Sequence, residues 1–174
     1  MKEFAMMHEP EHYVADILNA AGGRLVSRVR LQKVAYLLDQ LGAESGFRYS
    51  YHHYGPYSRD LDSAILDAEA FGLVKEDYGH RKSDGARYSV FLNQAASNEF
   101  SCLKNDRLQA ITKWLSTQNV TVLELAATAH WLAEIEKVVD WKAEIRRRKG
   151  SKTDSGRLEE ATKLLAEVGL PPAA

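Results

Sequence analysis

Residues 47–72 constrain the fold more than any other part of the chain. From Phe47 to His53 two sets of residues alternate, which predicts a half-buried strand. One set is Phe47, Tyr49, Tyr51 and His53, and the other is Arg48, Ser50 and His52. The sequence Tyr-Gly-Pro-Tyr at 54–57 predicts a turn. Ser58 is a favourable N-cap for a helix over 59–71, and Gly72 is suited to end it. A short strand, a turn and a capped helix are therefore expected in direct succession.

Two helices are expected before this segment and a hairpin after it. The first begins near Pro10 and is stopped by Gly22, and Ser27 caps the second, which ends at Gly42. The β-prone residues 24–26 lie between these helices. Segments 73–76 and 87–91 predict a hairpin with a long connection that contains an Asp-Gly turn signal. The order of helix, helix, short strand, helix and two strands resembles a winged helix, which we expect over residues 10–92.

The rest of the chain is expected to be helical. A helical stretch is predicted around 94–117, Thr121 with Glu124 predicts a capping box for the next helix, and residues 158–168 predict a last amphipathic helix. We find no linker between the two halves. The expected fold is therefore mostly α (α+β): one domain over 1–174, with the winged-helix-like half and its small β-hairpin packed on a helical half at 94–170.

Composition excludes several classes of protein. The chain is 45% apolar and 27% charged, and its net charge of −1 gives no global attraction to nucleic acid or to an anionic membrane. It contains one cysteine, which excludes an internal disulfide and fits a reducing compartment. No apolar run is long enough to span a membrane, and the N-terminus has no apolar signal core. We therefore expect a cytoplasmic protein without contact with a membrane.

The third helix carries the most informative charge pattern. At 100° per residue its inner face is predicted to contain Leu61, Ala64, Ile65, Ala68 and Phe71. The opposite strip contains Arg59, Ser63, Leu66 and Ala70, with Asp62 and Glu69 on one side and Asp60 and Asp67 on the other. An apolar strip rimmed by charges is typical of a protein-contact patch. Two alternatives are a solvated acidic helix with one exposed leucine and a strip covered by the C-terminal helices.

The same helix is a poor match for nucleic acid, because it presents one arginine against four carboxylates, whereas affinity for phosphates comes from lysine and arginine. Basic residues lie elsewhere. Segment 142–152 has six cations against Glu144, and the predicted wing contains His80, Arg81, Lys82 and Arg87. The cations of 142–152 have two interpretations. They form a binding patch for phosphates or for an acidic partner, or they lie at a helix C-terminus, where the helix dipole favours positive charge.

No catalytic or cofactor-binding motif is present, so we expect no enzyme activity, no cofactor and no metal. His52 and His53 are adjacent and would point to opposite faces of a strand, so we expect one to be packed and the other exposed. Cys102 lies within the predicted helical stretch and has no base near it in the sequence, which predicts a buried structural thiol. Ser58 is explained as a helix cap.

Several segments together resemble the SocA-like antitoxin domain family, also called Panacea, and most closely its YwgA-like branch. The resemblance rests on Leu31-Gln32-Lys33 within 30–38, on Tyr54-Gly55-Pro56-Tyr57-Ser58 and on Gly72-Leu73-Val74, and more weakly on 124–129 and 160–165. It spans about 12–170. The family turn has a small apolar residue after the proline, where this chain has Tyr57. The resemblance implies a non-enzymatic antitoxin that neutralises a toxin by direct contact, or an adaptor that delivers the toxin to a protease.

These observations favour a protein-binding module whose partner is a protein, with a toxin encoded by a neighbouring gene as the leading candidate. The expected contact residues are Arg59, Asp62, Leu66 and Glu69, followed by Tyr57, Arg81 and Lys82. The alternative is a winged-helix transcriptional regulator that binds duplex DNA through the wing and the basic segment 142–152. A homodimer is the third hypothesis.

Overall fold

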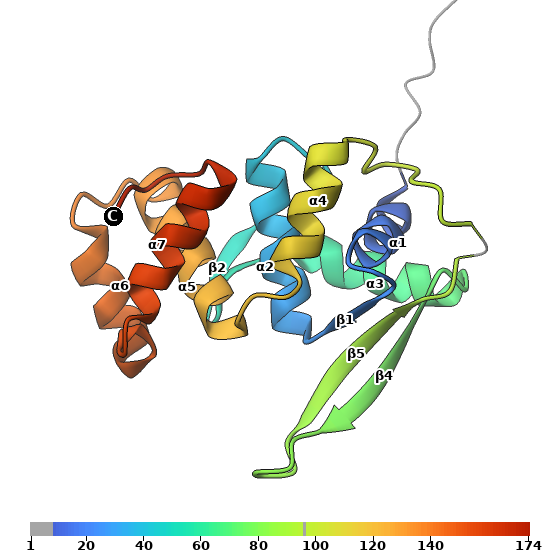
Figure 1. The fold of residues 1–174 in the computed structure, drawn as a ribbon, viewed down its shortest axis with the longest axis horizontal. Helices are drawn as coiled ribbons and strands as arrows, with labels where there is room; N and C mark the ends of the chain where they lie inside the picture. The colour runs from blue at the N-terminus through green and yellow to red at the C-terminus, as the bar shows by residue number, and fades with distance from the viewer. Residues whose placement is uncertain (1–8, 96) are drawn as a thin grey trace, which may run out of the picture.

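The computed structural model describes residues 9–174 except residue 96, and it shows a mostly α protein of the predicted α+β class (Figure 1). Its first half consists of α1 (Pro10–Ala20), β1 (Arg24–Val26), α2 (Arg28–Gln40), β2 (Ser50–His52), β3 (Gly55–Tyr57), α3 (Arg59–Ala70), β4 (Val74–His80) and β5 (Arg87–Asn93). The three-stranded sheet is antiparallel in the order β1-β5-β4. Apart from β3, which forms within the predicted turn, this is the order of elements predicted for the first half of the chain.

The long hairpin β4–β5 is tied to the helices at one end only. Leu25 of β1 pairs with Phe91 of β5, and both side chains are buried. The β4–β5 pairing continues outward from Val74 opposite Asn93 to His80 opposite Arg87. Because β1 covers only the inner part of β5, the tip of the hairpin at 81–86 projects away from the helices (Figure 1).

The predicted strand and turn at 47–57 form a tighter structure than the sequence indicates. The strand is confined to Ser50–His52, and most of the predicted turn forms its partner strand, Gly55–Tyr57. Gly55 has a φ of +88°, and a Cβ atom at this position would lie 2.4 Å from Oγ1 of Thr128. A glycine is therefore required for this hairpin to pack on α5 (Val120–His130).

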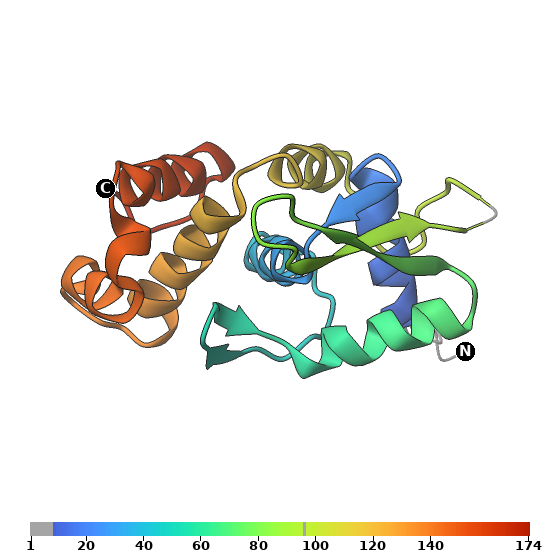
Figure 2. The same cartoon turned by 90° about the horizontal axis from the view of Figure 1, so that it is seen from below.

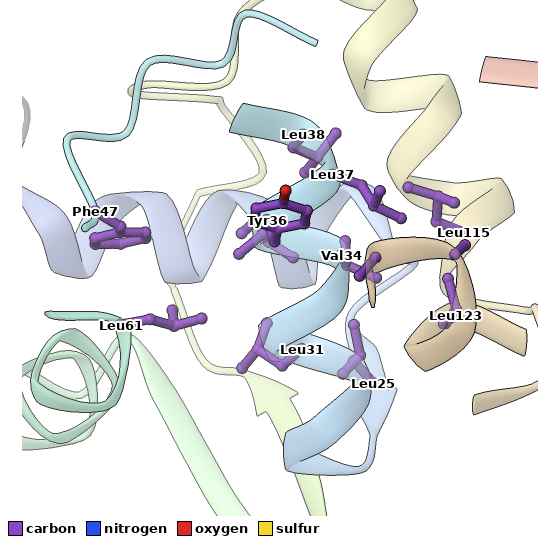
Figure 3. Packing of buried hydrophobic residues seen from close by; sticks show 14 of the residues in the cluster. Leu25, Leu31, Val34, Tyr36, Leu37, Leu38, Phe47, Leu61, Leu115 and Leu123 are labelled. Atoms are coloured by element: carbon purple, nitrogen blue, oxygen red, sulfur yellow. The ribbon is translucent and has the colours of Figure 1, made fainter. Parts of the chain in front are cut away.

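Helix α2 is the centre of the core. Its residues from Leu31 to Leu38 are buried on every side. Figure 3 shows them among Leu61 of α3, Leu115 of α4 (Asp106–Leu115) and Leu123 of α5. One cluster of buried apolar side chains includes residues of both halves of the chain. Inside it, the hydroxyl of Tyr36 lies 2.7 Å from Nδ1 of His130, and burial lowers the pKa of this histidine.

The C-terminal half surrounds α5. After α5 come a π-helical turn η1 (Trp131–Ile135), α6 (Trp141–Lys149), a 3₁₀ turn η2 (Gly150–Thr153) and α7 (Arg157–Val168). Helix α5 is buried from Val122 to His130, and α7 is its main neighbour. Within the described part of the chain, none of the helices has both the length and the apolar character needed to cross a membrane.

Two predictions for this half are wrong. None of the described residues between 94 and 105 is helical, because the carboxylate of Asp16 accepts hydrogen bonds from the backbone N–H groups of Ser101, Cys102 and Leu103, and α4 begins only after Asn105. The predicted capping box at Thr121 and Glu124 is also absent. Asn119 caps α5 instead, by accepting from the N–H groups of residues 121 and 122, and Glu124 is buried.

Candidate partner-binding site

The start of α3 is fixed by α2. The hydroxyl of Ser58 accepts a hydrogen bond from the N–H of Leu61 at 3.2 Å, as expected for an N-cap. The side-chain amide of Gln32 binds both backbone groups of Ser58: it accepts from the N–H at 2.8 Å and donates to the carbonyl at 2.9 Å. Both residues are buried, so the direction in which α3 leaves the core is set by this contact.

Helix α3 has one buried face and one open face. Leu61, Ala64, Ile65 and Ala68 are at most 1% exposed, and they pack against α1 and β4. The opposite strip is exposed at Arg59, Ser63, Leu66 and Ala70, and Leu66 itself is 64% exposed. Figure 2 shows α3 along one edge of the molecule, with the C-terminal helices elsewhere. The strip is therefore open in the single chain.

Phe71 does not belong to the buried face, contrary to the sequence prediction. Its side chain is 70% exposed. The helix ends at Ala70, and the chain turns away at Gly72, which has a φ of +71°. The helical periodicity therefore does not extend to position 71, and a second large apolar side chain is exposed near the C-terminus of α3.

Asp62 is an internal anchor more than a rim residue. Its carboxylate accepts hydrogen bonds from Arg28 at 3.1 Å, from Gln32 at 3.1 Å and from the hydroxyl of Tyr57. The hydrogen bond to Asp62 raises the pKa of Tyr57. Two of the predicted contact residues, Tyr57 and Asp62, are thus bound to each other, and their polar atoms are committed to the fold.

The other carboxylates of α3 fall into two groups. Asp60 accepts from the backbone N–H of Arg48 at 2.9 Å and from its guanidinium at 3.2 Å, and these hydrogen bonds lower the pKa of Asp60. Asp67 and Glu69 are exposed and form no ion pair with any residue that the structure describes. The uncompensated negative charge of α3 is therefore at its C-terminal end.

Arg28 joins α2, α3 and the long hairpin. Besides Asp62, it binds the carboxylate of Glu76 at 2.8 Å, and this carboxylate also accepts from the hydroxyl of Ser89 at 2.7 Å. Burial alone would lower the pKa of Arg28, but the hydrogen bonds and charges of Glu76 and Asp62 together outweigh it and raise the pKa. The positive charge between α3 and the hairpin is thus neutralised within the fold.

The two predicted contact residues of the wing lie apart from α3. Arg81 pairs with Asp84 at 2.7 Å within the tip, and Lys82 beside it is exposed. Both lie at the end of the hairpin that projects away from the helices (Figure 1). The structure therefore groups five of the predicted residues at α3, namely Tyr57, Arg59, Asp62, Leu66 and Glu69, and separates the two wing residues from them.

Most cations of the basic segment 142–152 are also paired. Arg147 binds Glu144, and Arg148 binds Glu144 at 2.7 Å and Glu136 at 2.9 Å. The hydrogen bonds from these arginines lower the pKa of Glu144 to about 2. Lys149 and Lys152 both bind the buried carboxylate of Glu124. Of the six cations, only Lys142 and Arg146 have no ion pair among the described residues.

A group of buried charges behind the β2–β3 hairpin is not predicted by the sequence pattern. Lys33 is 1% exposed, and its ammonium donates to the carbonyl of Pro56 at 2.6 Å. Burial lowers the pKa of Lys33 to about 7. Lys149 donates to the carbonyl of His53 at 2.9 Å and to Glu124 at 2.7 Å. Periodicity could not reveal Lys33 and Glu124, because α2 and α5 are buried on nearly all sides and their inward positions are not limited to one apolar stripe. Lys149 lies in the basic last turn of α6.

The remaining chemically active side chains are dispersed. Both His52 and His53 are exposed, so the prediction that one is packed is wrong; the ring of His52 lies 4.6 Å from that of Tyr57. Cys102, which was predicted to be buried, is partly exposed, and its partial burial raises the pKa of the thiol to about 11. Among the described residues, no three His, Cys, Asp or Glu side chains are placed to hold a metal ion.

The chain matches no protein-family model, and no curated protein matches it. What the site can do is therefore set by its own geometry: an open helix face with an apolar centre and charged ends, held in place by buried hydrogen bonds.

Proposed function

We propose that this chain is a non-enzymatic protein-binding module that contacts its partner through the outer strip of α3, formed by Arg59, Ser63, Leu66 and Ala70. The observation that carries the proposal is the 64% exposure of Leu66 at the centre of this strip. Burying a leucine side chain contributes about 1.5–3 kcal/mol, which is the magnitude of an interface anchor. The polar side chains of Arg59 and Glu69 supply the rim that such an anchor requires.

The resemblance to SocA-like antitoxins supports a particular kind of partner. It suggests a cytoplasmic antitoxin or proteolytic adaptor that binds a toxin encoded by a neighbouring gene. In this account the toxin is neutralised because its active surface is covered by α3. Two of the segments that carry the resemblance bind each other in this fold, because Gln32 and Lys33 contact the turn from which α3 starts.

Electrostatics supports a polypeptide partner over DNA. Docking α3 in a DNA groove would bring Asp67 and Glu69 near phosphates, and each close like-charge pair costs about 1 kcal/mol even in high dielectric. Arg28, which lies between α3 and the hairpin, is already neutralised by Asp62 and Glu76. Counterion release, the main source of affinity for DNA, therefore has few cations to draw on at this face.

The proposal is tested by co-purifying the product of the neighbouring gene with the tagged chain. Leu66→Glu should weaken the complex at least about tenfold, because it places a charge at the centre of the contact. Ile135→Glu is the matched control, since Ile135 is 48% exposed but belongs to η1 at the other end of the molecule. Equal capture by the wild type and Leu66→Glu would remove α3 as the binding site.

A regulator that binds duplex DNA is the second candidate, because Lys82 is exposed at the projecting tip, and Lys142 and Arg146 are exposed on α6. Its signature would be a steep loss of affinity with salt, by several powers of ten between low and moderate ionic strength. Lys82→Glu should then weaken binding, whereas Leu66→Glu should not. If the chain instead binds a protein through α3, Leu66→Glu should weaken binding and Lys82→Glu should not.

A further inference from the structure

The outer strip of α3 has charges of opposite sign at its two ends. The first two carboxylates are neutralised, since Asp60 pairs with Arg48 at 3.2 Å and Asp62 with Arg28 at 3.1 Å. This leaves the exposed Arg59 as a positive charge at the N-terminal end. At the C-terminal end, the exposed Asp67 and Glu69 have no ion-pair partner among residues 9–95 and 97–174. The helix face is therefore positive at one end and negative at the other.

The signs of these unpaired charges are the reverse of those that the helix dipole favours, whereas the paired Asp60 and Asp62 in the first turn agree with it. A helix dipole attracts negative side chains to the N-terminus and positive ones to the C-terminus. Arg59 is the first residue of α3, whereas Asp67 and Glu69 lie in its last turn, which contains no basic residue. Stability of the isolated helix does not explain this arrangement. Contact with a surface of complementary charge does.

A second copy of the same strip has that complementary charge. Positions 59, 63, 66 and 70 are separated by four, three and four residues, the spacing of residues along the seam of two packed helices. In an antiparallel pair related by a two-fold axis between positions 63 and 66, position 59 faces 70 and position 63 faces 66. Each large side chain, Arg59 or Leu66, then meets a small one, and each Arg59 lies beside Asp67 and Glu69 of the other copy.

We propose that a second copy of this chain covers the strip, with α3 packed antiparallel against α3 about a two-fold axis. Two-fold pairs are the commonest oligomers, and they require a self-complementary surface of this kind. The contact is short, because α3 has 12 residues and is about 18 Å long. The dimer is therefore weak, with a dissociation constant in the micromolar range. The pairing is independent of the proposed function; only its consequence, competition between the second copy and the protein partner, rests on that function.

Charge reversal in two separate variants tests the pairing. Sedimentation equilibrium across the micromolar range should show wild-type dimers, and both Arg59→Glu and the double variant Asp67→Arg/Glu69→Arg should raise the dissociation constant at least about tenfold. An equal mixture of the two variants should associate again, because the reversed charge at position 59 of one faces the reversed charges at positions 67 and 69 of the other. Mere loss of a charged residue cannot produce this recovery.

Two controls separate lost pairing from lost folding. Both variants should unfold at the wild-type temperature or above it, since each reversal removes an unfavourable interaction with the helix dipole. Arg146→Glu, which reverses an exposed charge on α6, should leave the dimer intact. A monomeric wild type at all concentrations, or a mixture that stays monomeric, overturns the inference. If the wild type forms dimers but capture of a protein partner does not depend on Leu66, the proposed function is wrong and the pairing of the two copies is still supported.

Discussion

The ammonium of Lys33 and the carbonyl of Pro56 form a buried hydrogen bond of 2.6 Å, which joins α2 to the β2–β3 hairpin. Gln32, the preceding residue, binds Ser58 at the start of α3. The two segments that carry most of the family resemblance are therefore in direct contact with each other. Their role in this fold is to set the position of α3, whose outer face remains open.

Lys33 should make stability depend on pH. Its folded-state pKa is about 7, below the ordinary value of 10.5, so between these values the unfolded chain binds more protons than the folded one. Stability should therefore rise with pH from about 7 to about 10, by at most ~1.4 kcal/mol per pH unit. In Lys33→Met this contribution should disappear. Urea denaturation at several pH values measures both slopes, and equal slopes would contradict the assignment. The part that comes from Lys149, whose pKa is also lowered by burial, should remain in both proteins.

Gln32 should be a strong determinant of stability. Gln32→Leu leaves the buried N–H of Ser58 without a partner and leaves its carbonyl with only the 3.4 Å hydrogen bond from the N–H of Asp62, so we expect a loss of about 1–3 kcal/mol in the free energy of unfolding. Gln94→Leu is the control, because Gln94 is exposed and should change stability by less than about 0.5 kcal/mol. Chemical denaturation of both variants gives the comparison. A small effect at position 32 would show that water satisfies Ser58 in the variant.

Removing one partner of the buried pair Glu124–Lys149 should cost more stability than removing both. Their side chains are 5% and 3% exposed, at an N–O distance of 2.7 Å. Glu124→Ala leaves the ammonium of Lys149 buried without a counter-charge, and we expect a loss of about 3–5 kcal/mol. In the double variant Glu124→Leu/Lys149→Met most of this loss should be recovered, because no buried charge remains. Lys152 is 42% exposed and can turn toward water. Additive losses in a double-mutant cycle would argue against this coupling.

Asp62 and Asp67 should behave differently although both are aspartates on α3. Asp62→Ala removes the acceptor shared by Arg28, Gln32 and Tyr57, so we expect a stability loss of about 1–3 kcal/mol. Asp67→Ala removes an exposed carboxylate and should change stability by less than about 0.5 kcal/mol. Thermal denaturation of the two variants side by side checks this. Equal effects would mean that Asp62 is not an anchor.

Local patterns were sufficient to predict the two faces of α3, because both depend on a period of 3.6 residues and on a single cap at Ser58. They failed where a residue distant in the sequence determines the partner of a side chain. From the sequence pattern Glu124 resembles a capping residue, but in the structure it binds Lys149. Asp62 resembles a rim residue, but in the structure it binds Arg28 and Tyr57. Helical periodicity puts Phe71 on the buried face, but the helix ends at Ala70, so the period no longer applies at position 71.

Hydroxyl-radical footprinting of the chain, alone and with its protein partner, tests the central claim most directly. The free chain should be kept dilute, so that self-association does not protect α3. Leu66 and Phe71, which are 64% and 70% exposed, should be oxidised in the free chain. Addition of the partner should protect Leu66, while Tyr78 of the hairpin and Ile135 of η1 remain reactive. Protection of Tyr78 or Ile135 with Leu66 still reactive, or protection of Leu66 by duplex DNA, would contradict the account.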